Sequence, residues 1–210
     1  MILTNDEATA SKLRALRSHG ASVSETDRHK NAGYLLPDFN ELGYNYRMTD
    51  IQAAVGIAQM RKMDHITSVR RQKAHLYDEL IKDMALDFLI PPYVPEGYFH
   101  TYQSYVCVLN MERFGLNCDS NDDIEKASLI RNQIMQKLDD IGIATRVGTH
   151  ASHMLGQYRD KFNIKPDDFI NSYKLDKLSI ALPLYVQMTE NDQVRVLDEI
   201  NNEMKSICSV

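Results

Sequence analysis

Residues 43–54 read Gly43-Tyr44-Asn45-Tyr46-Arg47-Met48-Thr49-Asp50-Ile51-Gln52-Ala53-Ala54, and this stretch decides the interpretation of the chain. Thr49 followed three residues later by Gln52 is the capping-box pattern, in which two side chains satisfy unpaired amides at a helix N-terminus. Apolar residues then recur at helical spacing, at Ile51, Ala54, Val55 and Ala58. The pattern predicts a helix from Thr49 onward, with a polar loop immediately before it.

The loop before this helix carries two side chains suited to anions, Asn45 and Arg47. Unpaired amide hydrogens and the helix dipole favour negative charge at a helix N-terminus. Asn45 adds a neutral donor, and the planar guanidinium of Arg47 matches a carboxylate or a phosphate. On chemistry alone the plainer interpretation is favoured, in which Asn45 serves a turn and Arg47 makes a surface ion pair. Both interpretations stay open at this point.

The rest of the chain alternates helix and strand signals around a small predicted sheet. Asn5 or Asp6 begins a first helix that Gly20 closes, and residues 21–48 form a long loop without clean periodicity. A long helix is predicted from Asp64 to Met84. The later pattern predicts a strand over 101–109, a helix over 122–141, a short strand over 143–147, an apolar run over 178–184 and a last helix capped by Thr189.

Composition excludes several classes of function. With 24 Lys+Arg against 29 Asp+Glu the formal net charge is −5, so the chain lacks the basic surface that nucleic-acid binding needs. No run of 18 apolar residues occurs, so no membrane span is predicted. Cys107, Cys118 and Cys208 are odd in number and lack CxxC spacing, which favours reduced thiols. We therefore expect a cytoplasmic globular protein that binds neither nucleic acid nor membranes.

A second group of polar residues, Arg146, His150 and His153, lies in and after the predicted strand over 143–147. Two histidines three residues apart could form part of a metal site, but no Cys or carboxylate follows at ligand spacing, and zinc needs at least three protein ligands. We therefore predict no metal site. These histidines either pack at a domain edge or contact a substrate. His19 also has two interpretations. It either contacts a substrate or only ends a helix, because glycine suits the left-handed turn at a helix C-terminus and the helix dipole there favours a histidine.

Residues 43–54 resemble the signature of the DegT/DnrJ/StrS family of sugar aminotransferases, which are pyridoxal-phosphate enzymes of the aspartate-aminotransferase fold. Other segments agree in order: 5–20 resembles the segment after the family's cofactor lysine, 70–77 its long linking helix, 143–153 its substrate loop and 182–185 its closing motif. The resemblance implies an α/β fold, the C-terminal part of the fold type I architecture. Residues 1–65 would be the tail of the large pyridoxal-phosphate domain, and residues 66–210 the linking helix and a small C-terminal α/β domain.

The resemblance also implies a reaction and the residues that serve it. Family members transfer an amino group, usually from glutamate, to a keto nucleotide-sugar, and they work as homodimers with active sites at the subunit interface. In the family the loop asparagine contacts the phosphate of the cofactor, pyridoxal 5'-phosphate, bound to the neighbouring subunit, which makes Asn45 the cofactor residue here. By the same resemblance, the candidate contacts to the nucleotide-sugar or the amino donor are Arg47, Arg146, His150, His153 and His19.

The family's Schiff-base lysine lies upstream of the position of Met1. The resemblance therefore predicts no catalytic residue within these 210 residues and no activity of the chain alone. It also suggests a truncated chain or a late start codon, because Ile2-Leu3 is the stub of a strand. Two alternatives stay open: a sugar dehydratase of the same family, in which a histidine replaces that lysine, and a non-catalytic remnant that binds a ligand or dimerises.

Overall fold

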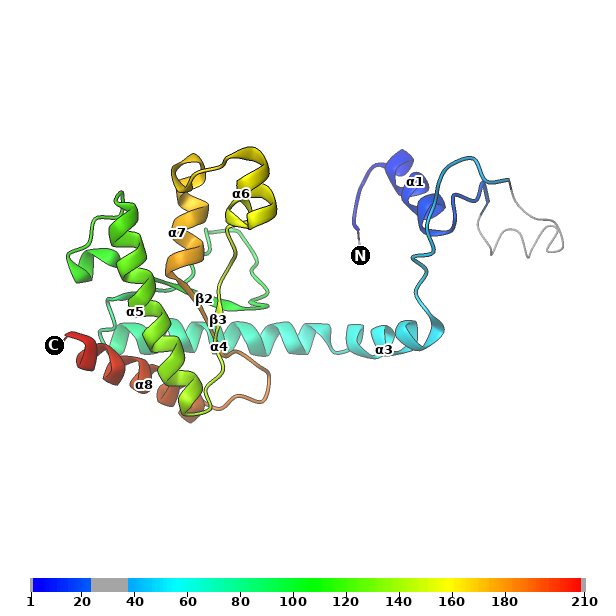
Figure 1. Cartoon of the computed structure of the whole chain (residues 1–210). Helices are drawn as coiled ribbons and strands as arrows, with labels where there is room; N and C mark the ends of the chain where they lie inside the picture. The colour runs from blue at the N-terminus through cyan, green and yellow to red at the C-terminus, as the bar shows by residue number, and fades with distance from the viewer. Residues whose placement is uncertain (1, 24–37, 209–210) are drawn as a thin grey trace. The chain divides into compact units, whose positions relative to one another are not determined.

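A computed structural model describes residues 2–23 and 38–208 of the chain. It falls into two compact units, Met1–Lys62 and Met63–Val210. Within the described residues the first unit contains helices α1 and α3, and the second contains a sheet and the other α-helices (Figure 1).

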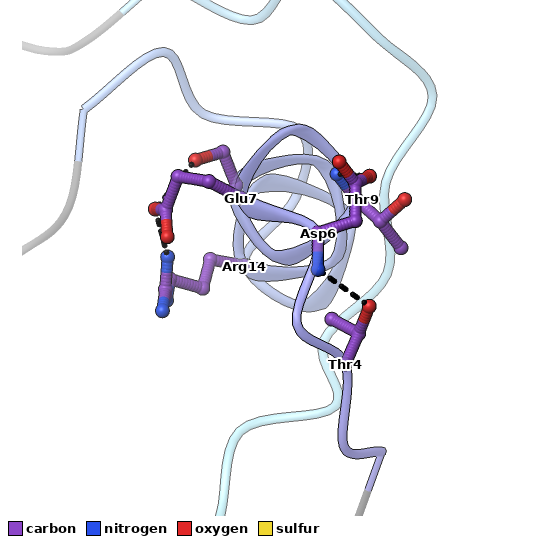
Figure 2. Close-up of polar contacts among 6 residues, drawn as sticks. Thr4, Asp6, Glu7, Thr9 and Arg14 are labelled. Carbon is purple, nitrogen blue, oxygen red and sulfur yellow. Dashed lines mark hydrogen bonds and ion pairs between the residues drawn. The ribbon is translucent and has the colours of Figure 1, made fainter.

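Helix α1, Glu7–Arg17, begins with local polar contacts that its sequence supplies. The Asp6 side chain accepts from the Thr9 amide at 2.8 Å, and the Asp6 amide donates to Thr4 Oγ1 at 3.1 Å (Figure 2). The bond from Thr9 holds the pKa of Asp6 below its usual value. Glu7 and Arg14 form an ion pair at 3.2 Å along the helix. The predicted helix start is therefore confirmed, whereas the helix ends at Arg17, three residues before Gly20.

Helix α3, Asp50–Met60, confirms the predicted capping box. Thr49 Oγ1 accepts from the Gln52 amide at 3.3 Å, and Gln52 Oε1 accepts from the Thr49 amide at 2.9 Å. Yet neither α1 nor α3 buries a residue within the described part of the chain. The apolar residues Ile51, Val55, Ile57 and Met60 are all more than half exposed. Helix α3 therefore exposes its apolar residues instead of burying them against the rest of the described chain.

The second unit is built on a four-stranded antiparallel sheet in the order β1-β2-β4-β3. The strands are β1, Leu89–Ile90; β2, Tyr105–Leu109; β3, Arg146–Val147; and β4, Ser179–Leu182. Tyr105, Cys107 and Leu109 alternate with less buried residues along β2, so one face of the sheet meets the core. Burial raises the pKa of the Cys107 thiol, and the nearby Asp78 adds to this rise. Cys107 is therefore a core residue, as its place in an apolar strand predicts.

Three long helices complete the core of the second unit: α4, Met63–Asp83; α5, Asn121–Asp140; and α8, Glu190–Cys208. Helix α8 packs against both α4 and α5 (Figure 1). Tyr77 Oη donates to the Pro183 carbonyl at 3.0 Å, and Gln193 Nε2 donates to the Lys73 carbonyl at 2.9 Å. The largest fully buried apolar side chains are Tyr77, Tyr105, Leu86, Leu109, Ile124, Ile134, Leu138, Ile180, Leu197 and Ile200.

The sequence prediction misses two α-helices and strand β1, and it overestimates the length of two strands. Helices α6, Gly156–Phe162, and α7, Ile170–Leu178, were not predicted, and neither has a side-chain cap at its N-terminus. The strand predicted over 101–109 begins only at Tyr105, because Tyr102 has a left-handed φ of 47° and its carbonyl accepts from Arg70 Nε at 2.6 Å. Of the strand predicted over 143–147, only the two residues of β3, Arg146–Val147, are in a strand. No described helix has the length and apolar character needed to cross a membrane.

Candidate functional site

The loop before α3 is held in place by backbone pairing with the end of α1. The Tyr44 amide donates to the Leu16 carbonyl at 2.7 Å, and the Tyr46 amide donates to the Arg17 carbonyl at 2.9 Å. The His19 amide donates back to the Tyr44 carbonyl at 2.9 Å. These bonds place Asn45 opposite Ser18 in an antiparallel bridge. The loop is therefore fixed to the end of α1 at the position of Asn45.

Two glycines allow this close approach. A Cβ at Gly43 would lie 2.0 Å from the Gly20 amide nitrogen, and a Cβ at Gly20 would lie 2.0 Å from the Glu41 carbonyl oxygen. Gly20 also has a φ of +78°, in the left-handed region that glycine adopts without strain. Both obstacles are backbone atoms, which cannot rotate away. Gly20 and Gly43 therefore fix how closely the loop lies against the end of α1.

The Asn45 and Arg47 side chains form one unit at the surface of this loop. Arg47 Nε donates to Asn45 Oδ1 at 3.3 Å. Because a guanidinium has no acceptor, Asn45 must turn its oxygen toward Arg47 and present its Nδ2 elsewhere. That Nδ2 makes no hydrogen bond to another described residue. An exposed amide donor beside a guanidinium is an arrangement that suits a phosphate or a carboxylate.

Two tyrosines, Tyr44 and Tyr46, flank Asn45 in the sequence. The rings of Tyr44 and Tyr46 stack with their centroids 5.1 Å apart and an interplanar angle of 6°. His19 lies next to this segment through its backbone, has a left-handed φ of 61° and is exposed. The structure thus brings together His19, Asn45 and Arg47. The other three candidates lie in the second unit.

His150 lines a cleft of about 500 Å³ in the second unit. Its Nδ1 lies 3.6 Å from Asp176 Oδ1. The cleft lies between α5, α6, α7 and the loop after β3, and the polar residues that line it are Glu125, His150, Arg159, Tyr173, Asp176 and Lys177. Polar side chains from elements distant in sequence converge here, which is typical of a ligand site.

Two neighbouring side chains in this cleft contact the carboxylate of Glu125. Lys177 Nζ lies 2.8 Å from Glu125 Oε1, and Tyr173 Oη donates to the same oxygen. Burial would raise the pKa of Glu125, but the bonds from Lys177 and Tyr173 together outweigh it and hold that pKa below its usual value. Burial, followed by the bond to Glu125, raises the pKa of Tyr173. Glu125 is therefore an anionic acceptor and Tyr173 a neutral donor near neutral pH.

Arg146 and His153 do not line the cleft. Arg146 lies opposite Ala181 on the edge strand β3, where it is exposed. The His153 ring lies 5.0 Å from that of Phe169, and its buried Nε2 has no hydrogen-bond partner among the described residues. No group of three or more potential metal-ligating side chains occurs within the described ranges.

The cleft contains five polar residues that the sequence analysis did not single out: Glu125, Arg159, Tyr173, Asp176 and Lys177. One signal could have found three of them. Tyr173, Asp176 and Lys177 are spaced by three and four residues, which places them on one face of a helix. Because residues 170–178 were not predicted to be helical, that face was not recognised.

A glycine also fixes the course of the chain from β3 to His150. A Cβ at Gly148 would lie 2.3 Å from Val106 Cγ1 and 2.8 Å from Ser179 Oγ. We expect Gly148→Ala to lower the free energy of unfolding by about 1–3 kcal/mol through overpacking. The control is Gly156→Ala at the start of α6, where the nearest atom is 3.6 Å away and no comparable loss is expected. Urea unfolding of both variants measures the difference, and equal midpoints would contradict the prediction.

A model of the DegT/DnrJ/EryC1/StrS aminotransferase family matches residues 1–201. The chain is similar to uncharacterized protein MJ1066 of Methanocaldococcus jannaschii, with 30% identity over 200 residues that cover 95% of this chain and 48% of that protein. It is also similar to spore coat polysaccharide biosynthesis protein SpsC of Bacillus subtilis, with 28% identity over 206 residues that cover 98% of this chain and 49% of that protein. The chain thus spans about half the length of these relatives.

Solved structures show the same fold. Helicobacter pylori PseC, an aminotransferase involved in the biosynthesis of pseudoaminic acid, matches with a TM-score of 0.76 at 19% identity, over 97% of this chain and 48% of PseC. The PLP form of Spr1654 from Streptococcus pneumoniae matches with a TM-score of 0.75 at 19% identity, over 97% of this chain and 45% of that chain. These likenesses confirm the predicted fold class, a mixed α/β chain that corresponds to the C-terminal part of fold type I.

Proposed function

The chain belongs to the DegT/DnrJ/EryC1/StrS aminotransferase family, and from this premise we propose that it forms the C-terminal portion of a pyridoxal-phosphate-dependent sugar aminotransferase. The observation that carries the proposal is the pair of Asn45 and Arg47, held at 3.3 Å on a loop anchored to α1. Residues 1–65 would belong to the large cofactor domain, and residues 66–210 to the linking helix and the small domain.

The residues present fit the phosphate of pyridoxal 5'-phosphate. Asn45 offers an Nδ2 with no other described partner, and Arg47 places a positive charge beside it. In our proposal Asn45 donates to the cofactor phosphate, and Arg47 binds an anionic group of the substrate or amino donor. Pyridoxal phosphate supplies the electron sink that amino-group transfer requires. The residues of this chain bind and orient the cofactor and the substrates.

We propose that Asn45 acts on the cofactor of a second subunit in a homodimer. The exposed apolar residues of α3, directly after the loop, support an interface at this place, because such a face is stable only when covered. Loops that complete a site in a neighbouring subunit must lie at the interface, and α3 would hold this one there.

The proposed substrates are a keto nucleotide-sugar and, as the amino donor, glutamate. SpsC is named for polysaccharide biosynthesis, and PseC for pseudoaminic acid biosynthesis, which supports a sugar substrate. Arg146, His150, His153 and His19 are the further proposed substrate contacts. The unpaired cysteine pattern supports a cytoplasmic location.

One consequence concerns the lysine that carries the cofactor. By the family resemblance, no lysine of these 210 residues matches the family's Schiff-base lysine, so we expect the chain to form no stoichiometric pyridoxyl-lysine. The chain is incubated with pyridoxal phosphate, reduced with borohydride and mapped by mass spectrometry. Scattered substoichiometric labelling is the expected result. Complete labelling of a single lysine, such as Lys12 or Lys62, would show that this chain contains its own cofactor lysine.

The direct test of the proposal is an amination assay. The chain is expressed together with any coding sequence in frame before Met1 and supplied with pyridoxal phosphate, glutamate and a keto nucleotide-sugar. Formation of an amino sugar with release of 2-oxoglutarate supports the proposal. Loss of water without amino transfer would favour the sugar dehydratase, and absence of a visible cofactor band would favour the non-catalytic remnant.

A further inference from the structure

The segment that carries Asn45 has two chemically different faces. The rings of Tyr44 and Tyr46 stack on one face, with an interplanar angle of 6°. Asn45 and Arg47 are joined by a hydrogen bond and share the other face. This is the alternation of an extended strand, in which successive side chains point to opposite sides. The proposed function uses the polar face and leaves the aromatic face without a role.

The extended conformation at Asn45 needs support from its neighbours. Asparagine is depleted in strands and favours turns, in which its side chain bonds to nearby backbone. The antiparallel bridge to Ser18 nevertheless holds Asn45 in an extended conformation. Tyrosine is enriched in strands, and one tyrosine lies on each side of Asn45. These tyrosines therefore favour a backbone conformation that asparagine itself disfavours.

The ring stack acts directly on the backbone of Asn45. Because Tyr44 and Tyr46 are two positions apart, the separation of their rings depends on the φ and ψ angles of the residue between them. Two residues of a strand span about 6.6 Å, whereas the ring centroids are 5.1 Å apart, so the rings lean toward each other. A turn at Asn45 would rotate the two tyrosines off their common face. The stack is therefore lost when Asn45 leaves the extended conformation.

The ring of Tyr46 can be replaced without disturbing the rest of the loop. Tyr46 is 73% exposed and Tyr44 52% exposed, so neither ring fills the core. The bond from Tyr46 to the Arg17 carbonyl is made by the backbone amide and does not depend on the side chain. A substitution of Tyr46 therefore removes the stack and leaves this backbone bond in place.

We propose that Tyr46 is a positioning residue that acts through Asn45. Its stack on Tyr44 keeps the Asn45 side chain beside Arg47 and aligned for the cofactor phosphate. The inference rests on the proposed function for the contact of Asn45 with the cofactor. The alignment of Asn45 with Arg47 is a property of the chain alone and can be measured without cofactor. The two proposals can therefore fail separately.

Three variants isolate the contribution of the ring stack. Tyr46→Val keeps a residue that favours strands but removes the ring, whereas Tyr46→Phe keeps a ring that can stack. The control is Tyr93→Val, because Tyr93 is an exposed tyrosine of the second unit that stacks on no ring among the described residues. Thermal unfolding checks that each variant is folded.

The first measurement is the NMR chemical shift of the Arg47 Hε proton in the 210-residue chain without cofactor. Asn45→Ala gives the reference position for an Arg47 side chain that lacks its bond to Asn45. We expect Tyr46→Val to move the resonance toward this reference, and Tyr46→Phe and Tyr93→Val to leave it in place. An unchanged resonance in Tyr46→Val, or an equal shift in Tyr46→Phe, would overturn the inference.

The second measurement is retention of pyridoxal phosphate by the complete enzyme in equilibrium dialysis. From the strength of an aromatic pair we expect Tyr46→Val to weaken retention about two- to tenfold, and Tyr46→Phe and Tyr93→Val to leave it unchanged. In an Asn45→Ala background Tyr46→Val should have no further effect, because a residue that acts through Asn45 needs its side chain.

The double variant separates positioning from an independent contribution. Additive losses from Tyr46→Val and Asn45→Ala would overturn the inference, because Tyr46 would then act on the cofactor site without Asn45. Unaltered retention in the Asn45→Ala enzyme would overturn the proposed cofactor contact instead. The Arg47 resonance then decides whether Tyr46 positions Asn45.

Discussion

Replacing Asn45 with alanine is expected to weaken retention of pyridoxal phosphate by roughly ten- to 150-fold in the complete enzyme. The estimate corresponds to about 1.5–3 kcal/mol for the loss of one hydrogen bond to a charged group. Folding should be largely unaffected, because Asn45 is exposed and the backbone bonds of Tyr44 and Tyr46 hold the loop. Equilibrium dialysis followed by the cofactor absorbance measures the affinity.

The matched control is Asn40→Ala. Asn40 lies in the same loop and is exposed, and its backbone amide rather than its side chain contacts Gly20. We expect Asn40→Ala to retain the cofactor as the unchanged enzyme does. An Asn45→Ala enzyme with unaltered affinity would show that Asn45 is only a turn residue.

Mixed dimers test whether the contact is made between subunits. One subunit carries Asn45→Ala, and the other carries a mutation of the Schiff-base lysine. In the mixed dimer the subunit with the intact lysine receives an intact Asn45 from its partner, so about one working site is restored per dimer. If confirmed subunit exchange restores no activity, Asn45 acts within its own subunit.

The parts of the fold that the sequence predicted are those that neighbouring residues determine. The capping box of Thr49 and Gln52 involves side chains three positions apart, so it can be recognised without knowledge of the rest of the molecule. Strands β1 and β3 are two residues long, and pairing with β2 and β4 defines them. Only the tertiary arrangement supplies that information, which explains why β1 was not predicted and why the bounds of β3 were too wide.

The same distinction applies to the candidate sites. Asn45 and Arg47 are two residues apart, and their contact follows the loop that was predicted before α3. The cleft residues Glu125 and Tyr173 are 48 positions apart and meet only because α5 packs against α7. Their role could not follow from spacing, because the structure of α7 was itself not apparent.

The contact of α5 with α7 depends on a buried charge, Arg131, whose replacement by methionine is expected to destabilise the second unit strongly. Arg131 is only 5% exposed. Its Nη1 donates to the Ser179 carbonyl at 2.9 Å and to the Asp176 carbonyl at 3.1 Å, and its Nε donates to Asn132 Oδ1 at 2.8 Å. Burial lowers the pKa of Arg131, although the nearby Asp176 partly opposes this.

Methionine fills much of the same volume but provides no donor, so two carbonyls at the junction of α7 and β4 lose their partner. Each unsatisfied group costs about 1–3 kcal/mol, and relief of the buried charge offsets part of the loss. We therefore expect Arg131→Met to lower the free energy of unfolding by about 2–4 kcal/mol, or the melting temperature by roughly 4–16 °C. Arg195→Met is the control, because Arg195 is exposed on α8 and makes one longer bond, 3.3 Å, to the Ile141 carbonyl. Its effect should stay within about 0.5 kcal/mol. Calorimetry measures the melting temperatures of both variants. Equal melting temperatures would mean that apolar packing alone joins α5 to α7. Arg131 would then not position α7, the helix that bears Tyr173 and Lys177.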